Sequence, residues 1–191
     1  HALIDNIEKG LINGEIAVVI SDKKGVYGLE RARKHGISAI EIDKREFNDR
    51  NDFMKAIINE LEGHEVELVV LAGFLSILSS DFIEKYRNRI MNIHPSLIPA
   101  FCGKGYYGQR VHKAVLEYGA KISGATVHFV DEGADTGPII LQEAVKVEEG
   151  DTPESLAARI LNVEHRLLPQ AVKLYCEDKL IIDGRKVSIR T

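Results

Sequence analysis

Apolar residues follow two alternating patterns through the first half of the chain. Compact apolar runs, such as Leu68–Leu71, are typical of strands covered on both faces of a sheet. Between these runs, apolar residues three or four positions apart, such as Phe53, Ile57 and Leu61, predict amphipathic helices. The predicted strands are 15–21, 38–43, 67–73 and 90–93, and the predicted helices are 2–14, 27–35, 53–63 and 80–87. This alternation indicates an α/β fold with a doubly wound, mostly parallel central sheet.

The second half of the chain has a different pattern, which adds antiparallel strands. Residues 96–109 contain prolines and glycines and predict a loop, which leads into a helix at 111–118. Two β-rich segments, 121–131 and 138–147, are joined by the turn 132–137, which carries two acidic residues. Together they predict a hairpin.

The last predicted helix begins after Thr152, because threonine is a good N-cap and the proline that follows suits the first helical position. Its apolar stripe continues to Leu174, and Pro169 is expected to kink the helix or to divide it in two. Two short strands, 180–182 and 187–189, flank the turn signal Asp183-Gly184 and predict a second hairpin.

Composition and charge fit one ordinary globular domain. The chain has 191 residues, of which 45% are hydrophobic and 28% charged. No apolar run approaches the roughly 20 residues of a membrane span, so we expect a cytoplasmic protein. With 25 basic and 29 acidic residues the net charge is -4, which makes nucleic acid a poor partner. Cys102 and Cys176 have no paired spacing and are expected to be reduced thiols.

The clearest candidate for chemistry is the end of the predicted strand at 90–93. Asn92 and His94 are two residues apart, so their side chains share one side of an extended backbone. Ligands bind at the carboxyl ends of strands in open α/β sheets. We therefore hypothesise that this amide and imidazole stabilise negative charge on a carbonyl oxygen under attack, with Asp135 favouring the charged imidazole against the opposing effect of burial. The alternative is that both are ordinary polar residues at a strand end, and that Asp135 only forms the turn.

Other motifs have simpler interpretations. Gly103–Gly108 matches GxGxxG, but it follows a loop instead of a strand, so it is not expected to bind a dinucleotide. A metal site built from His94, His112, His128 and Cys102 has no supporting spacing, and none is expected. The simple interpretation of His128 is a packed core histidine, and that of Arg50 and Glu164 is solvent exposure. The apolar segment 71–78 is either core or the floor of a pocket for a flat ligand.

Two motifs together resemble the folate-dependent formyltransferases. They are Asn92-Ile-His-Pro-Ser-Leu-Ile-Pro99 and the segment Thr126–Gly137 with its acidic turn. Ala72-Gly-Phe74, the loop 103–109 and Glu164-His165 are most similar to the members that act in purine biosynthesis. The resemblance implies the formyltransferase fold and transfer of a formyl group from 10-formyltetrahydrofolate to the amine of glycinamide ribonucleotide, with no metal.

The resemblance also implies roles for individual residues. His94 would act as general acid, Asn92 would polarise the formyl oxygen, and Asp135 would keep the histidine charged and order a water. Glu164 would lie near the ribonucleotide, and Thr126 and His128 would support the site. The residues expected at the folate are Arg50, Leu75, Ser76, Ile77, Leu78, Asn92, Asp131, Glu132, Gly133, Ala134 and Asp135.

The chain departs from the family at two places. We expect one formyltransferase domain over residues 1–191 that lacks the first strand and phosphate-binding loop with which members usually begin, so no phosphate-binding residue is named. Ser76 stands where some relatives carry arginine. The rival functions are a methionyl-tRNA formyltransferase, a formyltetrahydrofolate deformylase and a folate- or nucleotide-binding module without catalysis. The expected assembly is a monomer or a homodimer.

Overall fold

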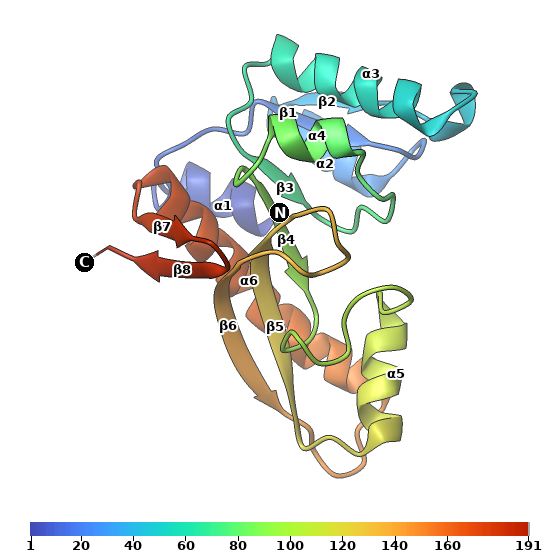
Figure 1. The fold of residues 1–191 in the computed structure, drawn as a ribbon, viewed down its shortest axis with the longest axis vertical. Helices are drawn as coiled ribbons and strands as arrows, with labels where there is room; N and C mark the ends of the chain where they lie inside the picture. The colour runs from blue at the N-terminus through green and yellow to red at the C-terminus, as the bar shows by residue number, and fades with distance from the viewer. Residues whose placement is uncertain (191) are drawn as a thin grey trace. The chain divides into compact units, whose positions relative to one another are not determined.

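The structure is a computed structural model that describes residues 1–190 as two units (Figure 1). The first unit holds His1 and Gly14–Ile90, and the second holds Ala2–Asn13 and the chain from Met91 onward. Thr191, the last residue of the expected domain, lies outside the described residues. That the two units make up one domain stays a prediction.

The first unit is built on a parallel pair of strands. β1 (Val18–Ser21) and β2 (Ser38–Glu41) pair in parallel, and the helix that joins them, α2 (Tyr27–Lys34), packs on both. A short 3₁₀ helix, η1 (Lys44–Glu46), then leads to α3 (Arg50–Gly63), β3 (Val69–Leu71) and α4 (Ser80–Lys85). Side chains at the N-caps accept backbone N–H bonds in both later helices, so each start is fixed locally.

The second unit is built on antiparallel strands. β4 (Ile90–His94) pairs with β5 (Ile122–Phe129), and β5 pairs with β6 (Ile139–Lys146). Beside β6 lies the hairpin of β7 (Leu180–Asp183) and β8 (Lys186–Ile189). The long helix α6 (Pro153–Cys176) packs on β5 and β6, and both α1 (Ala2–Glu8) and α5 (Gln109–Tyr118) contact α6 (Figure 1).

The predicted α/β fold, with antiparallel strands toward the C-terminal half, is confirmed, but one element prediction was wrong, and one of the two alternatives at Pro169 did not occur. The first helix ends at Glu8 instead of reaching residue 14, because Gly10 adopts a left-handed conformation with φ +67°. Pro169 does not divide the last helix, which runs unbroken for 24 residues. Buried side chains before and after the proline, including Leu167 and Ala171, pack the helix on both sides of it and outweigh the lost hydrogen bond.

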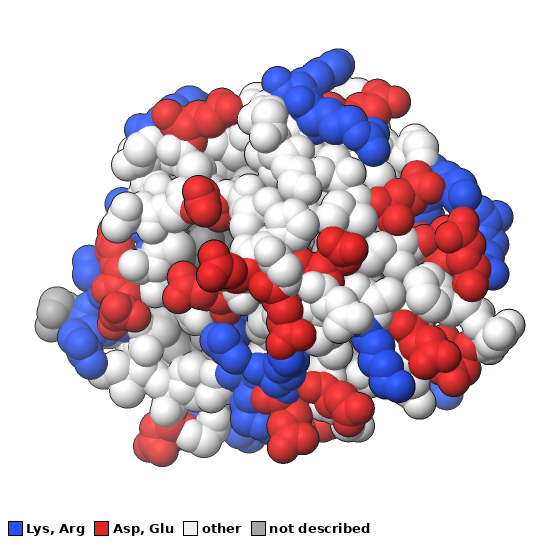
Figure 2. Space-filling model, turned by 90° about the horizontal axis from the view of Figure 1, so that it is seen from above, with Lys and Arg blue, Asp and Glu red and all other residues white. Residues whose placement is uncertain are grey.

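The surface of the described residues carries both signs of charge. On the face drawn in Figure 2, Lys and Arg side chains lie among Asp and Glu side chains and do not form one broad basic surface. Within residues 1–190, no helix has the length and apolar character that crossing a membrane requires.

Candidate active site

Asn92 and His94 lie on the same face of β4, as their spacing predicts, and this face continues onto β5. The strand register places Asn92 opposite His128 and His94 opposite Thr126. His94, Thr126 and His128 are each at most 4% exposed, whereas Asn92 is half-buried. Two neighbouring strands therefore present four polar side chains together at the carboxyl end of β4.

The turn between β5 and β6 brings Asp135 to this face. Its Oδ2 lies 3.5 Å from His94 Nδ1, and its Oδ1 lies 3.6 Å from His128 Nε2. The backbone N–H of Gly103 donates to Oδ2 at 2.8 Å, which fixes the carboxylate from the opposite loop. The three side chains named from the sequence thus meet within one unit of the fold.

The turn that carries Asp135 depends on a close backbone approach at Gly137. A Cβ atom at this position would lie 1.8 Å from the carbonyl oxygen of Phe129. Only glycine fits there, so Gly137 allows the end of β5 to fold back and present Asp135. Asp135 itself adopts a left-handed conformation with φ +58°, which Asp and Asn tolerate better than most residues.

Both ring nitrogens of His94 face oxygen acceptors. Nε2 lies 2.9 Å from the carbonyl oxygen of Phe101, so Nε2 carries a hydrogen and donates it. Nδ1 faces Asp135, where a proton can be donated only when the ring is charged. Burial lowers the pKa of His94 below its ordinary value, although the Phe101 carbonyl and Asp135 both raise it. Burial, the opposing effect noted from the sequence, therefore outweighs the carboxylate in the protein alone.

Asp135 stays ionised beside this ring. Burial would raise the pKa of Asp135, but its contact with His128, the hydrogen bond from the N–H of Gly103 and nearby His94 hold it below its ordinary value. A fixed carboxylate next to a neutral imidazole is an arrangement that stabilises the imidazolium once a proton arrives.

His128 orients Asn92. Its Nδ1 lies 2.8 Å from the carbonyl oxygen of Phe129 and so carries the hydrogen, which leaves Nε2 to accept from the amide of Asn92 at 3.2 Å. One N–H of the amide is then engaged, and the second is available to a ligand. His128 is a packed histidine with its hydrogen bonds satisfied, as the simple interpretation stated. Its partners include the site residues Asn92 and Asp135.

Thr126 secures the loop that follows His94. Its hydroxyl donates to the carbonyl oxygen of Ser96 at 2.6 Å and accepts from the N–H of Ile98 at 3.1 Å. Gln142 on β6 donates to the same hydroxyl and to the carbonyl oxygen of Ile98, both at 2.9 Å. The sequence did not indicate that Gln142, Ser96 and Gly103 contact the site. For Gln142 alone there was a signal, because the predicted hairpin pairs it with Thr126.

The first unit brings Arg50 to the apolar segment that follows β3. Arg50 Nη2 donates to the carbonyl oxygen of Leu78 at 2.7 Å. A hollow of about 380 Å³ is lined by Lys44, Phe47, Asn48, Asp49, Arg50, Phe53, Ser76 and Ile77. Leu75 and Ile77 are 63% and 72% exposed, so the core interpretation of this segment is wrong for these two residues and right for Leu78.

Glu164 on α6 is not on a solvated charged face. It is half-buried, and burial raises the pKa of its carboxyl to about 7. At neutral pH this group can therefore both accept and donate a proton.

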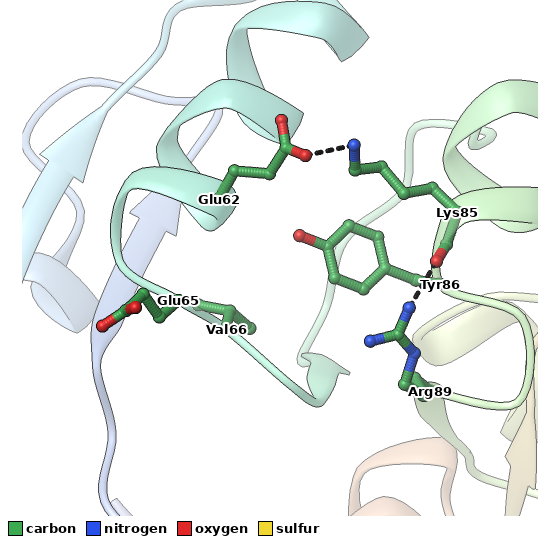
Figure 3. Close-up of a pocket in the computed structure, with 6 residues that line it drawn as sticks. All are labelled: Glu62, Glu65, Val66, Lys85, Tyr86 and Arg89. Carbon is green, nitrogen blue, oxygen red and sulfur yellow. Dashed lines mark hydrogen bonds and ion pairs between the residues drawn. The ribbon is translucent and has the colours of Figure 1, made fainter.

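Another hollow of the first unit, of about 360 Å³, has a different character (Figure 3). Lys85 is paired with Glu62, and the guanidinium of Arg89 lies over the ring of Tyr86, 5.3 Å from its centre, while it donates to the carbonyl oxygen of Lys85. These lining charges are already engaged with protein groups, so few remain for a ligand. Residues 1–190 contain no cluster of three or more His, Cys, Asp or Glu side chains that could hold a metal ion.

The geometry, two hydrogen-bond donors and a carboxylate at a strand end of an α/β fold, suits a transferase that stabilises an oxyanion. Residues 1–172 match the formyl transferase family, and the chain belongs to that family. It is 42% identical over 174 residues, 91% of its length, to the chloroplastic phosphoribosylglycinamide formyltransferase of Vigna unguiculata. It is 46% identical over 174 residues to the trifunctional purine biosynthetic protein adenosine-3 of Gallus gallus. The chain spans 56% of the first of these relatives and 17% of the second.

Solved structures agree in fold, and they include both a transformylase and a deformylase. The glycinamide ribonucleotide transformylase 1 of Symbiobacterium toebii superposes with a TM-score of 0.94 at 46% identity, over 100% of this chain and 87% of that one. A formyltetrahydrofolate deformylase from Pseudomonas syringae superposes with a TM-score of 0.89 at 25% identity, over 100% of this chain and 61% of that one.

Proposed function

We propose that this protein transfers the formyl group of 10-formyltetrahydrofolate to the amine of glycinamide ribonucleotide. The observation that supports it most is the convergence of Asn92, His94 and Asp135 at the carboxyl end of β4. The names of the most similar relatives and structures support the choice of substrates.

Asn92, His94 and Asp135 have different roles in the reaction. As the amine attacks the formyl carbon, negative charge develops on the formyl oxygen, and the unused N–H of Asn92 donates to it. The attacking amine loses a proton to His94, which becomes an imidazolium held by Asp135. His94 then gives a proton to the folate nitrogen as the bond between that nitrogen and the formyl carbon breaks. The developing negative charge favours the charged form of His94 and so opposes the effect of burial.

The remaining predicted residues bind the two substrates. In the first unit, the hollow combines apolar rings with the Arg50 cation, which supports the prediction that Arg50, Leu75, Ser76, Ile77 and Leu78 contact the folate. For the second unit, the prediction is that backbone groups of Asp131, Glu132, Gly133 and Ala134 do so. Glu164, with its pKa near neutrality, lies at the ribonucleotide and accepts a hydrogen bond or a proton from it. Thr126 and His128 support the site through the contacts described above.

The test is an assay of the full-length protein with 10-formyltetrahydrofolate and three acceptors: glycinamide ribonucleotide, methionyl-tRNA and water. We expect formyl transfer to the ribonucleotide alone. Replacement of His94 by alanine is expected to lower kcat by about 100-fold or more. Transfer to the tRNA or release of formate would assign the protein to one of the sister activities, and folate binding without any turnover would identify a binding module.

We further propose that the protein acts in the cytoplasm, as a monomer or homodimer, without nucleic acid or membrane. The net charge of -4 and the intermixed charges on the face drawn in Figure 2 support the exclusion of nucleic acid.

A further inference from the structure

Three aromatic side chains meet beside the proposed active site. The ring of Phe101 lies edge-on to Tyr118, with ring centres 5.7 Å apart and planes at 76°, and edge-on to Tyr106 at 6.4 Å. Tyr118 is the last residue of α5, a helix that packs against α6. Its side chain is nevertheless 82% exposed.

The backbone of Phe101 is held in a conformation that aromatic residues rarely adopt. Its φ is +50°, in the left-handed region, where the Cβ atom crowds the backbone. In this conformation its carbonyl oxygen accepts from His94 Nε2 at 2.9 Å and from the hydroxyl of Ser96 at 3.3 Å. Such conformations persist only where surrounding contacts impose them.

We propose that Tyr118 is a positioning residue, which acts through the ring of Phe101 to hold the carbonyl of Phe101 against His94. The contact joins the end of α5 to a loop residue whose carbonyl selects the ring nitrogen that carries the proton. With Nε2–H directed at Phe101, Nδ1 is left facing Asp135. The inference deepens the proposed function, because it concerns the residue assigned to proton transfer.

The other groups around His94 set the direction of the expected effect. Asp135 raises the pKa of His94, whereas His128 lowers it, and His94 in turn lowers the pKa of buried His112 on α5. The carbonyl of Phe101 raises this pKa as well. A Phe101 carbonyl that is held less firmly raises the pKa of His94 less, so burial lowers this pKa further.

The experiment reads the imidazole directly, so it does not depend on activity. Nitrogen-15 NMR of the protein without substrates gives the tautomer and titration of His94, assigned by loss of its signals in His94→Gln. We compare wild type with Tyr118→Ala, which removes the ring, and Tyr118→Phe, which keeps it. Tyr27→Ala, which removes a 61% exposed ring stacked on Arg31, is the matched control.

We expect Tyr118→Ala to shift the His94 titration to lower pH and to reduce the fraction with hydrogen on Nε2. Tyr118→Phe and Tyr27→Ala are expected to match wild type. If the protein has the proposed activity, kcat of Tyr118→Ala falls between about 2-fold and about 10-fold, the range of an aromatic pair, with KM unchanged. An unchanged His94 tautomer and titration in a folded Tyr118→Ala protein would overturn the inference, and so would an equal shift in Tyr118→Phe. Absence of formyl transfer in wild type would reject the proposed function and leave the NMR result standing.

Discussion

Asp135→Asn is the substitution that tests the proposed catalytic group most directly. It removes a charge while it keeps the shape of the side chain. The asparagine carbonyl can still accept from the N–H of Gly103, and asparagine tolerates the left-handed backbone at φ +58°. Unit charges separated by the 3.5 Å between His94 Nδ1 and Asp135 Oδ2 attract by about 5 kcal/mol at an effective dielectric constant of about 20.

Solvent and the neighbouring dipoles reduce that attraction, so we expect the pKa of His94 to fall by about 1 to 3 units in Asp135→Asn. The imidazolium is then harder to form at neutral pH, and kcat at pH 7 is expected to fall by about 10-fold to about 1,000-fold. The pH dependence of kcat should move to lower pH by the same number of units.

The assay is the pH profile of formyl transfer under saturating substrates. Asp178→Asn is the matched control, because Asp178 also has a positive φ, of +51°, and lies in the turn after α6. We expect it to leave the profile unchanged. Wild-type rates and an unshifted profile in Asp135→Asn would refute the role of this carboxylate.

Three further substitutions test other parts of the structure. Asn92→Ala removes the amide donor to the oxyanion and is expected to lower kcat by about 100-fold to about 1,000-fold, measured by turnover. It also leaves Nε2 of buried His128 without its donor, so calorimetry is expected to show a lower unfolding temperature. Glu164→Gln should stabilise the protein at pH 8 by on the order of 1–3 kcal/mol and very little at pH 5, measured by urea unfolding. The pKa of Glu164 is about 7 in the folded protein, above the ordinary value of 4.5. The contribution of Glu164 to wild-type stability is therefore complete below pH 4.5 and is lost as the pH rises from 4.5 to about 7. Gly137→Ala should lower the free energy of unfolding by on the order of 1–3 kcal/mol in the same urea assay, because the added Cβ meets the carbonyl oxygen of Phe129. It should also lower kcat. A free energy of unfolding equal to that of wild type would contradict the close approach.

Local sequence determined most of the elements and the first half of the site. The alternation of apolar runs with helical spacing predicted β1 to β4 and the helices between them, since side-chain period follows directly from backbone geometry. The two-residue spacing of Asn92 and His94 placed both side chains on one face for the same reason. The division considered at Pro169 did not occur, because the packing of a whole helix decides whether a proline breaks it.

Only the tertiary structure decided what surrounds these two side chains. Asp135 reaches His94 because β5 pairs with β4 and Gly137 lets the following turn fold back, a long-range arrangement that no local pattern encodes. The contacts of Gly103, Gln142 and Phe101 likewise join segments that are distant in the chain or backbone atoms that carry no sequence signal. The pKa of His94 depended on the balance between burial and a nearby carboxylate. Both are properties of the folded protein, so the sequence by itself could name the residue but could not settle its protonation.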